Sequence, residues 1–543
     1  MRPFVTILAI LALMLSMSVG AQEAPREAPR GDLKAEIARL LAEMPAAEGA
    51  ELRGFYSTRD HRAAWGERQQ VAAFAEALET LESDGLDPRD YRADRLVAEH
   101  RRLQEANAGP AEQARFELAT STLLLTALRH LQRGRLDPRT VDPQWEIPVE
   151  PARLDFEAIS RAVDGQRFEQ AFGEARPAYA PYERLRSGLA RYRNIERVGG
   201  WAPLPGEPRV LRRGDVDDVV ALLRSRLAME GELEVMAADP GAFPGAELDT
   251  PDPRRFDAAL EAAVRRFQRR HLLEADGIVG PQTRAALNVP VSTRIDQIRL
   301  NLERARWLLH GLPEAFVLVD IAGYQLSYFR PNGELWRTRI VVGRPYRRTP
   351  SLRSEITHMT VNPTWTIPPT ILREDVLPQV RRDLGYLWRE RLQVLSPSGA
   401  PLDPWQVDWN NPGNIMLRQA PGPQNALGQV AIRFPNDHLV YLHDTPAQGL
   451  FAREQRAFSS GCIRVQGVLE FAQLLFDDTG SGQDIGALIE AGQTRNVSLA
   501  LRMPVILHYW TVHPGEEGQL VFRPDIYERD DALLRALNRP LAL

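Results

Sequence analysis

Residues 315–343 read AFVLVDIAGYQLSYFRPNGELWRTRIVVG. Three segments of this stretch, 316–321, 325–329 and 335–342, alternate apolar and polar side chains with the period of a β-strand. The tripeptide Pro331-Asn332-Gly333 supplies a turn between the second and third segments. The stretch therefore predicts an antiparallel β meander and places the start of a mainly β domain here.

A helical insertion is predicted to interrupt this β domain. Residues 362–369 read NPTWTIPP, and their three prolines cannot donate hydrogen bonds to a central strand ladder. Helical spacing of apolar residues follows, so we expect an insertion at about 371–394 that could act as a lid.

The β pattern returns after the insertion. Apolar strand-like segments and one amphipathic helix are expected at 429–434, 439–442, 468–475 and 505–511. We place the β domain at 312–512 and a C-terminal extension at 513–543.

Upstream of the β domain the pattern is helical. Residues 33–205 carry apolar side chains at helical spacing, and one strongly apolar helix ends at Gly-Arg-Leu-Asp-Pro, residues 134–138. The segment has no cysteine, no metal-spaced histidine cluster and no glycine-rich phosphate loop. We interpret it as an α-helical scaffold domain without chemistry of its own.

A smaller helical unit is predicted at 208–290. A Pro/Gly-rich connector at 199–206 precedes it. Two helices are expected before Phe267-Gln268, and a third starts at Pro281, which favours the first position of a helix. The result is three short helices around one small core.

The first 21 residues are typical of a secretory signal peptide, with a basic start, an apolar run from Phe4 to Leu15 and a small-residue site at Val19-Gly20-Ala21. Residues 22–32 form a polar lead-in. The apolar run is shorter than the ~20 residues of a spanning helix, although an uncleaved inner-membrane anchor is the alternative. The residue directly after the cleavage site is Gln22 and not a cysteine, which excludes lipoprotein attachment. We expect an exported protein, in a bacterial periplasm.

Composition narrows the classes of function. The chain has 543 residues, which suggests three to four domains. A net charge of −5 argues against nucleic acid as a partner. Lys34 is the single lysine, which argues against catalysis by a lysine Schiff base or by a Ser/Lys dyad.

Cys462 is the single cysteine, so no intramolecular disulfide can form. In an oxidising compartment such a thiol is either sealed in a core or kept for its reactivity. A thiol nucleophile needs a base within hydrogen-bond reach, and His443 lies nineteen residues upstream at the end of a predicted strand. The backbone carbonyl of Asp444 could orient the imidazole, and the amides of Gly461 and Cys462 could stabilise an oxyanion. By residue type alone, a buried structural cysteine is as good an interpretation.

Two motifs resemble known families. Phe267-Gln268 followed by Asp-Gly-Ile-Val-Gly-Pro-Gln-Thr at 276–283 is similar to the three-helix peptidoglycan-binding domain, over about 208–290. His443 with Ser-Ser-Gly-Cys-Ile-Arg at 459–464 resembles the signature of the L,D-transpeptidase (YkuD-type) catalytic domain. The family pattern often has histidine at the position of Ser460, so this resemblance leaves His443 as the base.

The resemblance implies a multidomain α+β protein of the large periplasmic branch: a helical scaffold, a peptidoglycan-binding module and a mainly β, sandwich-like catalytic domain with a helical lid. It implies Cys462 as nucleophile, His443 as base, the Asp444 carbonyl as orienting acceptor and Gly461 as an oxyanion donor. Further candidates for substrate contact, each with a structural role as the alternative, are Arg464, Tyr441, Ser459, Ser460, Trp365 and Asn362.

The implied activity is formation of 3→3 peptidoglycan cross-links through a thioester on a tetrapeptide stem, with release of D-Ala and with carbapenems as acylating agents. No metal or organic cofactor is implied. The implied partners are peptidoglycan stem peptides and glycan, with cell-wall synthesis proteins as further candidates. The alternatives are a carboxypeptidase or cysteine peptidase that hydrolyses stem peptides, and a non-catalytic wall-binding scaffold.

Overall fold

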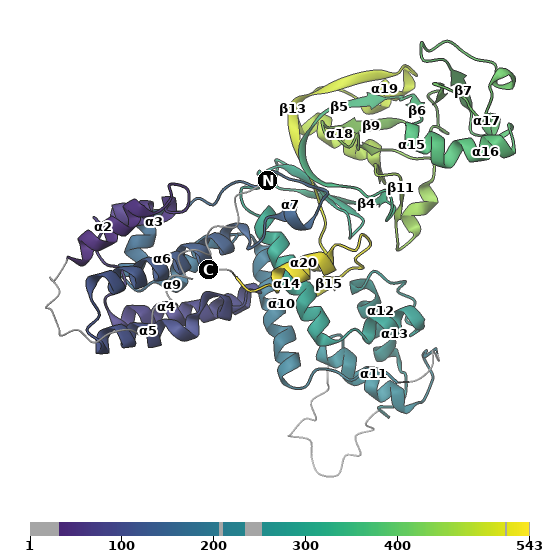
Figure 1. Cartoon of the computed structure of the whole chain (residues 1–543). Helices are drawn as coiled ribbons and strands as arrows, with labels where there is room; N and C mark the ends of the chain where they lie inside the picture. Colours follow the sequence, from purple (N-terminus) through teal and green to yellow (C-terminus); the bar gives the residue numbers. More distant parts are fainter. Residues whose placement is uncertain (1–31, 206–209, 234–251, 516–517, 542–543) are drawn as a thin grey trace.

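The computed structural model describes residues 32–205, 210–233, 252–515 and 518–541. The predicted signal peptide (residues 1–21) and nearly all of the predicted polar lead-in (residues 22–32) lie outside these ranges. Figure 1 shows a helical N-terminal region, a small helical module and a β domain, which meet around the long helix α14 (Val291–Leu308). In the described residues, no helix combines the length and apolarity that a membrane crossing requires.

The N-terminal region is helical, as its periodicity predicts. Its longest helix, α6, ends at Arg133, directly before the predicted stop at Gly134. Buried side chains such as Phe55, Phe74 and Leu128 form one core. The elements are α2 (Leu33–Glu43), α3 (Ala50–Thr58), α4 (Arg68–Glu79), η1 (Thr80–Asp84), η2 (Pro88–Tyr91), α5 (Ala93–Glu105), α6 (Pro110–Arg133), α7 (Pro138–Val141), β1 (Trp145–Glu146), α8 (Phe156–Asp164), α9 (Phe168–Ala175) and α10 (Ala180–Arg197).

The three-helix module comprises α11 (Asp218–Met229), α12 (Ala258–Arg270) and α13 (Pro281–Leu287) around its own core. The motif residues of this module bond to one another. The buried amide of Gln268 donates to Asp276 Oδ1 at 2.8 Å and to Thr283 Oγ1 at 3.1 Å, and it accepts from the amide of Gly277 at 2.9 Å. In this structure the motif holds the turn against the helix.

The β domain is built on one ten-stranded mixed sheet. The predicted meander is confirmed, because β2 (Phe316–Asp320), β3 (Gln325–Phe329) and β4 (Leu335–Gly343) pair antiparallel in sequence order. The strand order is β1-β5-β13-β2-β3-β4-β12-β10-β9, β11 joins β4, and β9 also pairs with β5. The sheet therefore closes on itself around a core that α18 and α19 complete. The other elements are β5 (Ser351–Val361), β9 (Val430–Arg433), β10 (Leu442–His443), η5 (Gln448–Ala452), β11 (Ala457–Ser459), β12 (Ile463–Val465), α18 (Val468–Asp478), α19 (Ile485–Glu490) and β13 (Arg495–His508).

The insertion is larger than the helical segment predicted at 371–394. It spans 365–419, which we call the inserted subdomain, and contains a three-stranded sheet in the order β6-β8-β7. Its own core includes Ile367, Val380 and Leu417, so it folds as a unit beside the main sheet. Its elements are β6 (Trp365–Thr366), α15 (Pro369–Ile371), η3 (Leu372–Val376, a π-helical turn), α16 (Leu377–Arg382), α17 (Tyr386–Arg389), β7 (Leu392–Leu395), η4 (Pro404–Gln406) and β8 (Met416–Gln419).

The domains interlock rather than follow one another as separate units. Strand β1 of the helical region pairs in parallel with β5 of the main sheet. The C-terminal residues return to the centre as the hairpin β14 (Val512–Pro514) and β15 (Leu520–Phe522) and as α20 (Asp530–Leu537), whose Leu533 packs near Leu300 of α14. The segment predicted as an extension is thus part of the packed body, because its apolar side chains are buried there.

Candidate active site

The register of two neighbouring strands brings the predicted site residues together. Parallel pairing of β10 with β12 sets Leu442 opposite Ile463 and His443 opposite Arg464. Leu442 and Ile463 are fully buried in the core. Side chains alternate along a strand, so His443 and Arg464 face the other side of the sheet, and Cys462 joins them there. Cys462 and His443 are diagonal neighbours on one face.

The loop before the cysteine is fixed by short hydrogen bonds. Gly461 has a φ of +114°, a backbone conformation that favours glycine. Its amide donates to Ser459 Oγ at 3.1 Å, and Ser459 Oγ donates to the carbonyl of Cys462 at 2.5 Å. The Gly461 carbonyl accepts from the buried hydroxyl of Thr349 at 2.8 Å. Since the Gly461 amide is already bonded, the expected oxyanion donor at Gly461 is occupied in this structure.

The imidazole of His443 is buried and oriented by the backbone. Its Nδ1 lies 2.5 Å from the carbonyl oxygen of Asp444, so a proton on Nδ1 leaves Nε2 as the unprotonated nitrogen. The Asp444 carboxylate points elsewhere and accepts from the amide of Gln429 at 2.9 Å. Burial, with the charge of Arg464 adding to it, lowers the pKa of His443 to about 3. The imidazole is therefore neutral at physiological pH.

The thiol of Cys462 is half-buried, and its sulfur lies 3.9 Å from the carbonyl oxygen of Leu439. Burial raises the pKa of Cys462, although hydrogen bonding by Tyr441 and the charges of Arg433 and Arg464 act in the opposite direction. Within the described ranges, no hydrogen bond joins Cys462 to His443. Burial thus favours the neutral form of both groups in the resting site, because it raises the pKa of the Cys462 thiol and lowers that of the His443 imidazole.

Two arginines surround the thiol. The guanidinium of Arg433 on β9 lies 3.8 Å from the ring centre of Tyr441, whose own ring centre lies 5.6 Å from that of His443. Arg464 has a buried Nε atom without a hydrogen-bond partner among the described residues. Both cations are placed to stabilise a thiolate once it forms.

The described residues contain no group of three or more His, Cys, Asp or Glu side chains arranged to hold a metal ion.

Family models match three parts of the chain. The model described as "L,D-transpeptidase catalytic domain" matches residues 314–480, which include the cysteine, the histidine and the inserted subdomain. Residues 314–480 are an L,D-transpeptidase catalytic domain. A "Putative peptidoglycan binding domain" model matches residues 242–287, of which 242–251 lie outside the described ranges, and a "Scaffold domain" model matches residues 50–189.

A curated relative from Haemophilus influenzae, named "Putative L,D-transpeptidase", is 34% identical over 218 residues. The match covers 39% of this chain and 44% of the relative, so the chain spans less than half of the relative's length. Two solved structures of L,D-transpeptidases also match. The one from Mycobacterium smegmatis is 14% identical, with a TM-score of 0.19 over 36% of this chain and 58% of that chain. The one from Xylanimonas cellulosilytica is 15% identical, with a TM-score of 0.17, and the match covers 56% of this chain and 100% of that chain.

Sequence reasoning missed the residue that joins the cysteine loop of the L,D-transpeptidase domain to the inserted subdomain. Arg347 donates to Ser460 Oγ at 2.8 Å and forms ion pairs with Glu374, at 2.9 Å, and with Asp375. Both carboxylates lie on the π-helical turn η3. A run of arginines after a predicted strand, Arg-Pro-Tyr-Arg-Arg at 344–348, is the one local signal for it.

Three of the predicted substrate contacts have other surroundings. The side chain of Asn362 is buried and donates to the carbonyl of Ile489 in α19 at 3.0 Å, so it closes a helix end. Trp365 lies in β6 and packs against the core of the inserted subdomain. Ser459 is buried, and both of its hydroxyl contacts are to the cysteine loop. These positions suit structural roles, whereas Tyr441, Ser460 and Arg464 stay beside the thiol.

Proposed function

We propose that the chain is a cell-wall L,D-transpeptidase that forms 3→3 cross-links through a thioester at Cys462. The observation that carries this proposal is the placement of Cys462 and His443 on one sheet face, with Nδ1 of His443 bonded to the Asp444 carbonyl. Thiol, base and orienting acceptor are the parts that nucleophilic acyl transfer requires.

Acylation begins with the neutral pair. The thiol proton passes to Nε2 of His443 while Sγ attacks the carbonyl carbon of diaminopimelate at the third position of a tetrapeptide stem. The amide of Cys462 donates to the resulting oxyanion, and Arg433 and Arg464 stabilise the developing negative charge. When the intermediate collapses, the carbon–nitrogen bond to D-Ala breaks and its nitrogen takes the proton from His443. A thioester remains on the enzyme.

Transfer uses the same base. The neutral side-chain amine of a second stem's diaminopimelate attacks the thioester carbonyl, and His443 accepts the proton that this nitrogen loses. The carbon–sulfur bond breaks, and the departing thiolate recovers a proton from His443. The products are a new amide cross-link and free Cys462.

The proposal includes a route by which transfer prevails over hydrolysis. Water must be kept from the thioester, and the inserted subdomain is positioned for this because Arg347 ties its η3 turn to the loop at Ser460. We further place the enzyme in the periplasm, because the first 21 residues resemble a cleavable signal peptide.

Incubation of the purified chain with tetrapeptide muropeptides tests the proposal. We expect cross-linked dimers and released D-Ala with the natural sequence, and neither with Cys462→Ser or His443→Gln. A carbapenem should add its mass to the natural chain and not to Cys462→Ala. Tripeptide products without dimers would identify a hydrolase instead, and unchanged substrate would leave only a binding role.

A further inference from the structure

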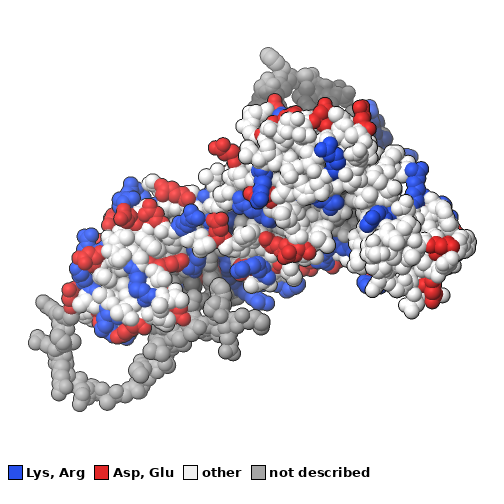
Figure 2. Space-filling model, turned by 90° about the horizontal axis from the view of Figure 1, so that it is seen from above, with Lys and Arg blue, Asp and Glu red and all other residues white. Residues whose placement is uncertain are grey.

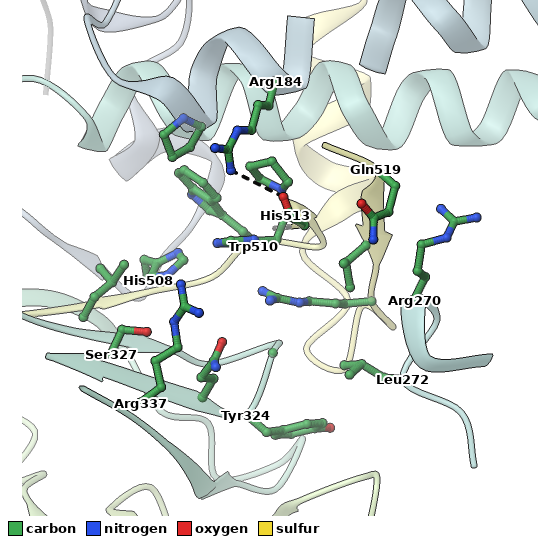
Figure 3. Close-up of a pocket in the computed structure, with 18 of the residues that line it drawn as sticks. Arg184, Arg270, Leu272, Tyr324, Ser327, Arg337, His508, Trp510, His513 and Gln519 are labelled. Atoms are coloured by element: carbon green, nitrogen blue, oxygen red, sulfur yellow. Dashed lines mark hydrogen bonds between the residues drawn. The ribbon is translucent and has the colours of Figure 1, made fainter. Parts of the chain in front are cut away.

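A large cavity lies apart from the inserted subdomain, none of whose residues lines it. It has a volume of about 1340 Å³ and lies where α10, the three-helix module, the main sheet and the β14–β15 hairpin meet. In the close-up, Arg184 extends from α10 and Arg337 from β4 toward the space between them (Figure 3). None of the residues assigned to the thiol chemistry lines this cavity.

The lining is strongly cationic. Nine arginines but only two glutamates, Glu230 and Glu232, line the cavity. Both glutamates are already ion-paired with the buried Arg270, and Glu232 also pairs with Arg266 at 3.7 Å. Six of the arginines are exposed, and they come from the scaffold, the module and β4: Arg184, Arg191, Arg266, Arg269, Arg337 and Arg339.

This charge is local. On the face of the molecule in Figure 2, acidic and basic side chains are interspersed. The chain as a whole carries a net charge of −5. An excess of arginines in one cavity of an acidic chain therefore favours an anionic ligand at that place.

Buried polar atoms in the cavity wall add a second observation. His508 is 2% exposed, and neither of its ring nitrogens has a hydrogen-bond partner among the described residues. The hydroxyl of Tyr324 is likewise buried without a partner in the described ranges. Leaving such groups unsatisfied is costly, so their position at a cavity points to a polar ligand or to bound solvent that a ligand would replace.

The shape of the charge distribution favours a peptide over a phosphate group. A phosphate would need its arginines to converge on one point, whereas these arginines stand on three separate walls. Carboxylates spaced along an extended chain match that arrangement. Apolar side chains such as Leu309, Phe316 and Phe329 line the remaining wall and suit the aliphatic parts of such a chain.

The cavity and the thiol lie at the two ends of β12. Gln466 lines the cavity and directly follows β12, whereas Cys462 directly precedes that strand, so their separation of four residues spans at most about 13 Å of extended chain. Arg339 also lines the cavity, and it donates at 3.2 Å to the carbonyl of Phe451 in η5, which lies beside β4. A polymer held in the cavity is thus close enough to present another of its stems to the thiol.

We propose that this arginine-lined cavity is a second binding site, which holds a carboxylate-bearing stem peptide of peptidoglycan while a different stem reacts at Cys462. The inference rests on the proposed function for its choice of ligand. It assigns to the junction of the three units a substrate-docking role that is separate from the chemistry.

A photoreactive tetrapeptide, L-Ala-D-Glu-diaminopimelate-D-Ala, tests the site on the full chain with Cys462→Ala. Labelled positions are mapped by mass spectrometry after proteolysis, and the labelling yield is followed against probe concentration. We expect labels within 325–339, 508–515 and 518–523. The triple variant Arg184→Gln, Arg269→Gln, Arg337→Gln should weaken this labelling about tenfold, because it removes one exposed cation from each wall.

The matched control is Arg115→Gln, Arg495→Gln, Arg535→Gln, which removes three exposed arginines away from the cavity. We expect its labelling curve to stay within about twofold of the parent, and a probe with amidated carboxylates to label poorly. Equal labelling of the two triple variants would overturn the proposal. Competition with inorganic diphosphate gives a second outcome that would overturn the proposal. If diphosphate displaces the probe at a concentration equal to or lower than the concentration of unlabelled tetrapeptide that does so, the cavity is a phosphate site.

Failure of this proposal is distinguishable from failure of the proposed function. Dimer formation is measured separately on the chain with Cys462 intact and with soluble muropeptides. Dimers without specific labelling would remove the second site and keep the activity. Specific labelling without dimers would keep the site and remove the activity.

Discussion

The guanidinium of Arg347 donates a hydrogen bond of 2.8 Å to the hydroxyl of Ser460, two residues before the cysteine. The same guanidinium pairs with Glu374 and Asp375 of the inserted subdomain. One side chain thus links the nucleophile loop to the element proposed to cover it. Ser460 stands where the family pattern often has a histidine, and here that position serves as an anchor for Arg347.

Replacing Arg347 by Gln is expected to shift the enzyme from transfer toward hydrolysis. Losing both ion pairs frees the η3 turn, so water reaches the thioester more often. We expect the ratio of tripeptide to dimer products to rise about three- to tenfold, with little change in melting temperature because the partners are partly exposed. Product analysis by chromatography measures the ratio. Arg353→Gln, an exposed arginine on β5, is the control, and an unchanged ratio in Arg347→Gln would remove the linking role.

The pKa of the thiol predicts how its alkylation depends on pH. Iodoacetamide reacts with the thiolate, and burial raises the pKa of Cys462. The alkylation rate should therefore rise with pH through a midpoint above that of an ordinary thiol. Arg433→Gln removes a charge that lowers this pKa and should move the midpoint higher still. Arg495→Gln serves as a distant control, and a midpoint below pH 7 in the natural chain would contradict the neutral resting pair.

Thr349 is expected to hold the nucleophile loop. Its buried hydroxyl donates to the Gly461 carbonyl at 2.8 Å and accepts from the Gly343 amide at 2.9 Å. Thr349→Val keeps the shape and removes both bonds, which should cost about 1–3 kcal/mol and slow acylation of Cys462 about tenfold. Thr349→Ser retains the hydroxyl and should acylate at nearly the natural rate. Intact-mass kinetics with a carbapenem measure both variants, and equal rates would show that the loop holds without Thr349.

Local sequence patterns predicted what is encoded locally. The strands at 316–342 and the three short helices have clear periods, and the spacing of His443 and Cys462 matched a motif. The strands of the inserted subdomain are only two to four residues long, too short for a period to appear, so its extent was underestimated. The burial that keeps the thiol and the imidazole neutral depends on tertiary packing, so the motif alone could not predict it.

The supports of the site lie far from it in sequence. Arg347 precedes its partner Ser460 by 113 residues. Tyr527 donates to the Gly343 carbonyl at 2.7 Å and follows Gly343 by 184 residues. Contacts between residues so far apart in the chain cannot be predicted from local sequence patterns. The error of treating 513–543 as an extension has the same cause, since only the folded chain places Tyr527 under the loop.

Acid should destabilise the chain through its buried histidines. Burial lowers the pKa of His508 to about 4, whereas the unfolded chain protonates this side chain near pH 6.5. Stability from His508 is complete above pH 6.5 and is lost as the pH falls toward 4, to a total of about 3 kcal/mol. His508→Phe should therefore lose less melting temperature than the natural chain between pH 7 and pH 5. His438→Phe, at an exposed histidine, is the control. If the natural chain and His508→Phe lost the same melting temperature between pH 7 and pH 5, His508 would already be protonated in the folded chain.

Removal of the C-terminal segment after residue 512 should disable the site although no catalytic residue is lost. Tyr527 donates to the Gly343 carbonyl and accepts from the Thr349 amide at 3.1 Å, and Thr349 in turn holds Gly461. Without this segment the apolar faces that Leu520, Phe522 and Leu533 cover become exposed, so we expect the melting temperature to fall by more than about 5 °C. The milder Tyr527→Phe keeps the packing and removes only the hydroxyl. It should slow acylation by about threefold to tenfold, since both buried hydrogen bonds of this hydroxyl are lost and each is worth about 1 kcal/mol. Scanning calorimetry and carbapenem intact-mass kinetics measure the two effects, and a truncated chain with natural stability and acylation rate would make the segment a true extension.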